Sequence, residues 1–249
     1  MHVALERENS RAVAELIRHP VYLAAGRMAA RGICPKGAYH IVLLPTAWGY
    51  CGAVWKNVGG GRAGERSDFP ASCEAKLSRI MTPGLPVSEM RRQLLAEHEG
   101  SQEVLCDPHG KFHPGVAPEW LGELAGYLQN YFSDGLRDAI EARFAATWSY
   151  WEPRLDLEQL TPFQRAVLTE VAQIPRGVVR TYAEMARRIG KPKAARAVGA
   201  ALGANPWPVI VPCHRVVGAS GAMVGFSAPG GVEQKKRMLA MERGEASKR

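Results

Sequence analysis

Residues 207–218 read WPVIVPCHRVVG and bring a thiol, an imidazole and a guanidinium together at Cys213, His214 and Arg215. A cysteine attacks as its thiolate, so the thiol needs a neighbour that lowers its pKa or takes its proton. The apolar run before Cys213 predicts a short buried strand. Prolines flank that run, and proline fixes φ and removes a backbone donor, which stiffens the chain. The pattern predicts a cysteine presented for chemistry rather than one needed only for packing.

The segment ahead of this motif contains clear helix boundaries. TPFQRAVLTEVAQIPRG starts at Thr161, with Pro at the first helical position and Gln164 placed to close a capping box. TYAEMARRIG repeats the pattern with Thr181 and Glu184 and ends at Gly190. A short KPK turn then leads to AARAVGAALGAN, a third predicted helix rich in small residues. This order predicts a helix-turn-helix, although a generic helical hairpin fits the shape equally well.

The first 160 residues show broader patterns and no catalytic motif. Residues 39–61 predict two strands around a turn at Trp48-Gly49, and the apolar spacing of residues 118–135 predicts a helix. Residues 10–31 predict an Ala-rich helix. The stretch 62–86 is rich in Gly, Pro and charge, so we expect a loop with one short helix.

The charge distribution separates the two halves of the chain. The 249 residues carry a formal net charge of +8, yet residues 1–152 hold 16 Lys and Arg against 17 Asp and Glu. Residues 153–249 hold 16 against 7. A basic half joined to a neutral half is typical of a protein that binds a polyanion, most often nucleic acid, although charge alone also fits a merely basic soluble surface.

Composition narrows the setting in which the chain works. No apolar run approaches the roughly 20 residues needed to span a bilayer, and the N-terminal stretch lacks a signal-peptide core. Five cysteines at irregular spacing argue against a disulfide scaffold and favour a reducing compartment. We therefore expect a cytoplasmic protein with no membrane contact, associated with the nucleoid or located in the nucleus according to its source.

Residues 161–244 closely resemble the C-terminal domain of the O6-alkylguanine-DNA alkyltransferases, also called methylated-DNA–protein-cysteine methyltransferases. The resemblance rests on RTYAEMARRIG, KAARAVGAALGANPWPVIVPCHRVV, SGAMVGFSAPGG and KKRMLAMERG. It implies an α/β (α+β) protein in which residues 159–249 form a winged helix-turn-helix domain. Residues 1–158 would form the family's variable α/β domain with a small sheet, here lengthened by an extension and insertions.

The resemblance implies direct repair of DNA in a single turnover. Cys213 would accept the alkyl group from O6-alkylguanine, with O4-alkylthymine as a further candidate lesion. His214 would take the thiol proton through a water, and Glu242 would orient the imidazole. Tyr182 would donate to the departing base, and Asn205 would hold the turn before the active-site strand. Nothing in the sequence suggests a way to remove the alkyl group afterwards.

The resemblance also implies binding of double-stranded DNA through the minor groove, with the damaged nucleotide flipped out of the stack. Arg196 would enter the stack in place of the extruded base. Its expected neighbours at the DNA are Lys193, Ala195, Gly199, Ala200 and Arg215. The expected substrate pocket comprises Tyr182, Val216, Phe226, Ser227 and Trp207. Phe226 stands where many members have Tyr, so it keeps the aromatic face and lacks the hydroxyl.

No cofactor is expected, and we expect a monomer. CDPHGKFH places Cys106, His109 and His113 at spacings that a zinc ion tolerates, but no CxxC pair accompanies them. We therefore favour ordinary thiols over a metal site. Three other classes of function remain open at this point: a DNA-binding regulator that senses alkylation or oxidation at Cys213, a non-catalytic lesion-binding relative, and a cysteine hydrolase.

Overall fold

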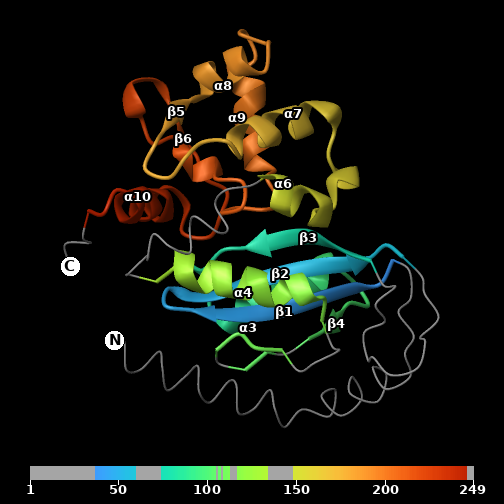
Figure 1. The fold of residues 1–249 in the computed structure, drawn as a ribbon. Coiled ribbons are helices and arrows are strands. Elements are labelled where there is room, and N and C mark those ends of the chain that lie inside the picture. The colour runs from blue at the N-terminus through green and yellow to red at the C-terminus, as the bar shows by residue number, and fades with distance from the viewer. Residues whose placement is uncertain are drawn as a thin grey trace.

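The computed structural model describes residues 37–59, 74–112 without 105 and 108, 117–133 and 148–245. The predicted helix at 10–31 and His113 of the zinc candidates lie outside these ranges. Within them the protein is a mixed α/β structure, in which a small sheet with two covering helices packs beside a helical group (Figure 1).

The sheet contains four strands in the order β3-β2-β1-β4. β1 and β2 pair antiparallel over their whole length, as the sequence predicts, with Thr46 opposite Gly49 at the turn. Helix α4 covers one face of the sheet and α3 the other (Figure 1). The elements of this region are β1 (Tyr39–Thr46), β2 (Gly49–Asn57), β3 (Ala75–Met81), α3 (Val87–Glu97), β4 (Gln102–Glu103) and α4 (Glu119–Tyr131).

The loop predicted for residues 62–86 is wrong over its second part, because residues 75–81 form β3. Its sequence, AKLSRIM, alternates charged Lys76 and Arg79 with apolar residues that are buried in the sheet. Val54 pairs with Arg79 and Trp55 pairs with Leu77, which leaves Ser78 as an extra residue in β3. This bulge interrupts the alternation of polar and apolar residues, so the sequence alone resembles a loop. β3 is the strand that faces the second half of the molecule.

The second half begins with a connector that lies along β3. The backbone N–H of Asp156 donates to the carbonyl of Leu77 at 2.9 Å, and Gln159 Nε2 donates to the carbonyl of Ser78 at 3.0 Å. Asp156 lies just before and Gln159 just after the boundary expected between residues 158 and 159, so residues on both sides of it contact β3, and that division remains a proposal. The connector comprises α6 (Trp148–Trp151), η1 (Glu152–Arg154) and η2 (Leu157–Gln159).

Three packed helices and a pair of short parallel strands follow, as the helix-turn-helix reading predicts. Both expected capping boxes are present, at Thr161 with Gln164 and at Thr181 with Glu184. These caps satisfy backbone donors that would otherwise be unpaired at the helix starts. The elements are α7 (Pro162–Val171), β5 (Arg180–Thr181), α8 (Tyr182–Arg188), α9 (Ala195–Gly203), η3 (Cys213–Arg215), β6 (Val216–Val217), η4 (Ala219–Gly221) and α10 (Gly231–Glu242).

The strand predicted before Cys213 is also wrong. The chain there makes a tight turn in which Pro208 and Val211 form a single bridge, and Val209 has a φ of 78°. A β-branched residue in the left-handed region is strained, and such strain persists only where the surroundings hold it. Val209 is buried, and Asn205 braces the turn from both sides: Nδ2 donates to the carbonyl of Val211, and Oδ1 accepts from the N–H of Trp207.

Candidate active site

Cys213 lies in the 3₁₀ turn η3, directly after the braced turn. The cysteine is buried, and burial raises the pKa of its thiol. A hydrogen bond from Asn205 and the positive charge of Lys235 oppose this effect without reversing it. The thiol is therefore protonated at rest, and a nucleophilic role requires a base.

His214 follows in the same turn and is fully buried. Its Nε2 lies 2.8 Å from Glu242 Oε1. Because a carboxylate can only accept, this contact assigns the ring hydrogen to Nε2 and leaves Nδ1 as the basic nitrogen. Nδ1 is buried and has no hydrogen-bond partner among the described residues. Burial lowers the pKa of His214 and outweighs the opposing effect of Glu242, so the imidazole is neutral near pH 7.

Glu242 ends α10 and is the centre of a buried polar cluster. Arg215 donates to it from Nε at 2.9 Å and from Nη2 at 2.8 Å, and its Nη1 donates to the carbonyl of Ile174. Burial by itself raises the pKa of Glu242, yet the hydrogen bonds from His214 and Arg215 and the positive charge of Arg215 outweigh it and hold the pKa far below its usual range. Glu242 is therefore an anion that fixes His214 and neutralises Arg215.

Arg215 does not lie where the sequence-based expectation of a DNA contact requires. Its side chain is buried and turned toward Glu242, so it serves the interior of the site. Trp207 differs from expectation too. It is fully buried, its indole N–H donates to the carbonyl of Leu77 at 2.9 Å, and it is absent from the lining of the cavity at Cys213. Each side chain turns inward because it meets a buried acceptor, Glu242 for Arg215 and the carbonyl of Leu77 for Trp207. The sequence alone does not reveal these acceptors.

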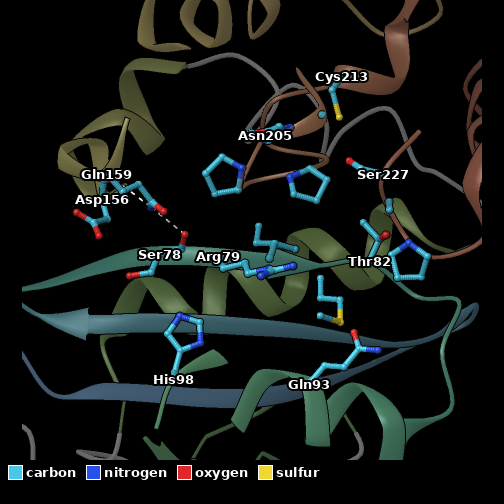
Figure 2. A pocket seen from close by; sticks show the side chains of 18 of the residues that line it. Ser78, Arg79, Thr82, Gln93, His98, Asp156, Gln159, Asn205, Cys213 and Ser227 are labelled. Carbon is cyan, nitrogen blue, oxygen red and sulfur yellow. Dashed lines mark hydrogen bonds between the residues drawn. The ribbon is translucent and has the colours of Figure 1, made fainter. Parts of the chain in front are cut away.

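A cavity of about 770 Å³ opens beside Cys213 and separates it from β3. Figure 2 shows Cys213, Asn205 and Ser227 on one side of it and Ser78, Arg79 and Thr82 on the other. Phe226 and Ser227, both expected in the substrate pocket, contribute to its lining. The sheet therefore forms a wall of the cavity in front of the thiol.

The remaining expected pocket residues, Tyr182 and Val216, are not part of the cavity lining. Tyr182 is half-buried, its hydroxyl donates to the carbonyl of Val224 at 3.2 Å, and its pKa is raised by burial and by the neighbouring Cys213 thiol. The carbonyl of Val216 accepts from Lys235 Nζ at 2.6 Å. The Lys235 ammonium is buried, lies 5.9 Å from the centre of the Tyr182 ring, and interacts with Cys213.

Two residues of the site were missed by sequence reasoning. Lys235 precedes Glu242 by seven residues on one helix, so helical periodicity places both on one face and was a usable signal. Tyr131 gave no such signal. Its hydroxyl lies 3.0 Å from His214 Nε2 and donates to Glu242 Oε1 at 2.7 Å, across separations of 83 and 111 residues.

The residues expected to meet DNA lie on or just before α9. Lys193, Arg196 and Ala200 are exposed, whereas Ala195 and Gly199 are partly buried. A side-chain Cβ at Gly199 would lie 3.7 Å from the Tyr182 ring, so α9 packs closely over the residue that neighbours the thiol. The helix thus exposes Arg196 on one side, while its other side packs on Tyr182.

Among the described residues no group of three metal-ligating side chains is present, and no helix is long and apolar enough to cross a membrane. Cys106 contacts the carbonyl of Leu43, and burial raises its thiol pKa to about 11. That environment suits a protonated thiol rather than a metal-bound thiolate.

Comparison with known proteins identifies the family. Residues 162–244 match the family model described as 6-O-methylguanine DNA methyltransferase, DNA binding domain. A methylated-DNA–protein-cysteine methyltransferase from Methanosarcina acetivorans is 41% identical over 149 residues, which cover 60% of this chain and 90% of that protein. The chain belongs to the methylated-DNA–protein-cysteine methyltransferase family.

Other members of the methyltransferase family align over a shorter part. The protein of that name from Mycobacterium tuberculosis is 45% identical over 112 residues, which cover 45% of this chain and 66% of that protein. The chain thus spans just under two thirds of that relative. A crystal structure of an OGT variant from Mycobacterium tuberculosis superposes with a TM-score of 0.51 at 26% identity, covering 85% of this chain and 97% of that one. The family resemblance expected from sequence is confirmed.

Proposed function

We propose that this protein repairs DNA by moving the alkyl group of O6-alkylguanine onto Cys213 in a single turnover. The observation that carries the proposal is the buried His214–Glu242 pair beside a protonated cysteine, in a domain that matches the family model. A neutral imidazole held by a carboxylate is the arrangement that turns a thiol into a nucleophile.

The proposed step balances as a displacement at saturated carbon. His214 takes the thiol proton at Nδ1 through a bridging water, and the sulfur forms a bond to the alkyl carbon. The bond from that carbon to guanine O6 breaks, and the electron pair leaves with the base. Tyr182, whose proton is retained at neutral pH, donates to the departing guanine. The product is a thioether on Cys213, which no described neighbour is placed to cleave.

Binding of the lesion belongs to the same proposal. The exposed basic residues on and before α9 contact the phosphates of duplex DNA in the minor groove, and Arg196 fills the space left by the flipped nucleotide. The flipped base enters the cavity beside Phe226 and Ser227. We also propose that the protein acts as a monomer in the compartment that holds DNA.

The test is the mass of the protein after mixing with duplex DNA that contains O6-methylguanine. One methyl group should appear on the peptide that contains Cys213, and Cys213→Ala should remove the transfer while DNA binding persists. Turnover of excess DNA, or a methyl group on another cysteine, would contradict the proposal. Arg196→Ala should slow transfer from the duplex far more than from the free modified base, since only the duplex must be opened.

A further inference from the structure

Tyr131 joins the sheet region, which comprises the described residues between 37 and 133, to His214 and Glu242, the pair that activates the thiol in the proposed function. It is the last residue of α4, and its side chain is 2% exposed. Its hydroxyl donates to Glu242 Oε1 at 2.7 Å and lies 3.0 Å from His214 Nε2. One phenol oxygen therefore contacts both members of the pair on which the proposed base depends.

This contact is more than packing. A buried hydroxyl is costly unless it is hydrogen-bonded, and this one is bonded to a carboxylate. Burial and the negative charge of Glu242 raise the pKa of Tyr131 well above its usual value, so the phenol keeps its proton and acts as a donor. Glu242 Oε1 thereby accepts from three groups: Tyr131, His214 and Arg215.

The helix that carries Glu242 is held to the sheet region at two further points. Gln234 Nε2 donates to the carbonyl of Pro83 at 2.6 Å. The Arg237 guanidinium lies 3.6 Å from the centre of the Trp48 ring, which packs in turn on Phe132 at the end of α4. Contacts near the start, middle and end of α10 thus fix its position, and Tyr131 is the one that reaches the site.

We propose that Tyr131 is a positioning residue for alkyl transfer, which shares the charge of Glu242 with His214 and holds both groups in place. The inference rests on the proposed function, in which neutral His214 takes the thiol proton. Tyr131 keeps its own proton throughout. Through Tyr131, the described residues around the sheet then contribute to thiol activation as well as to the wall of the cavity.

The contact has a consequence for the pH dependence of transfer. The charged and titratable groups that face His214 are Glu242 and Lys235 from α10, Arg215 and Cys213 from η3, and Tyr131 from α4. The hydrogen bond from Tyr131 stabilises part of the negative charge of Glu242. Without the hydroxyl, more of that charge stabilises protonated His214, so the pKa of His214 rises. Because transfer needs neutral His214, the acid limb of the rate profile moves to higher pH.

The experiment measures single-turnover methyl transfer to Cys213 from O6-methylguanine duplex DNA between about pH 5 and pH 9. Tyr131→Phe keeps the ring and removes only the hydroxyl. Tyr50→Phe is the matched control, because Tyr50 lies on β2 and interacts with Cys106 rather than with Glu242. Tyr131→Phe should move the acid limb upward by about half a pH unit and slow transfer several-fold at the acid end. Tyr50→Phe should leave the profile in place.

The possible outcomes separate this inference from the proposed function. If the unmodified protein transfers no methyl group, the proposed function fails and the inference falls with it. If it transfers and Tyr131→Phe lowers the rate equally at all pH values, Tyr131 has only a structural role. Should Tyr131→Phe fail to fold, a fluorinated tyrosine installed at position 131 replaces it. That stronger donor should move the acid limb downward, and an unchanged limb would overturn the inference.

Discussion

The sheet region, residues 37–133, and the helical region, residues 161–245, contribute different kinds of residue to one site. The helical region supplies Cys213, His214 and Glu242 from a continuous stretch with clear helix caps. The sheet region has no catalytic motif, yet it supplies β3 as a wall of the cavity and Tyr131 as a donor to Glu242. The groups proposed to react belong to a motif that is recognisable in sequence, whereas the residues that support them need only reach the right place in the fold.

The two regions each bury a histidine, and the comparison explains why one is suited to act as a base. His40 in β1 stacks on Trp55 and bonds to the neutral amide of Asn57, and burial lowers its pKa to about 4. His214 has the carboxylate of Glu242 as partner, which opposes the same effect of burial. A charged partner keeps an imidazole basic enough to take a proton, and a neutral one does not.

The largest expected effect is on the helical region's own chemistry. Glu242→Gln should slow methyl transfer roughly 100-fold or more, because His214 loses the carboxylate that orients it and supports its protonation. Glu233→Gln, on the exposed side of the same helix, is the matched control. The measurement is single-turnover transfer followed by protein mass. A loss of only a few-fold would mean that Glu242 has a purely structural role.

The next effect concerns the junction between the regions. Trp207→Ala should lower the free energy of unfolding by about 3–5 kcal/mol, since it removes a fully buried indole that packs against the sheet. Trp207→Phe should cost only about 1 kcal/mol, because the carbonyl of Leu77 keeps its hydrogen bond from Asp156. Urea denaturation measures both. Similar costs for the two variants would show that the indole hydrogen bond, not burial, joins the regions.

A smaller effect tests the histidine comparison through folding stability. The pKa of His40 is lower in the folded protein than in the unfolded chain, so its contribution is present above about pH 6.5 and is lost as pH falls toward its folded value. This histidine alone should cost about 2–3 kcal/mol between pH 7 and pH 4.5.

His40→Gln should flatten that loss in urea titrations at the two pH values, because glutamine does not titrate. The pKa of His214 is also lowered, and Glu242 is an anion in the folded state, so part of the acid sensitivity should persist in this variant. If the stability lost between pH 7 and pH 4.5 is the same in His40→Gln, protonation of His40 costs the folded protein nothing, which would contradict its burial against Trp55.

The smallest effect concerns the charge asymmetry. Each phosphate that the protein neutralises contributes about −0.9 to the slope of log K against log salt. Lys193→Gln, at an exposed position before α9, should therefore flatten the slope by up to about one unit without changing sequence preference. Lys111→Gln, exposed in the sheet region, should leave it unchanged. An equal change in both variants would make the sheet region a second DNA-binding surface.

Some local features of this protein were readable from its sequence. The caps at Thr161 and Thr181, the first two strands and the helix ending at Tyr131 follow from short-range spacing, which backbone hydrogen bonding and side-chain periodicity dictate. The family, and with it Cys213 and His214 as candidates, followed from a continuous motif. These signals survive in sequence because neighbours along the chain produce them.

The tertiary structure decided which side chains meet. The strand β3, the inward turn of Arg215 and the burial of Trp207 each depend on an acceptor or a partner strand far away along the chain. Tyr131 reaches Glu242 across 111 residues, and no local pattern marks it. A buried polar group must find a hydrogen-bond partner, and which partner it finds is fixed by how the elements pack rather than by the residues beside it.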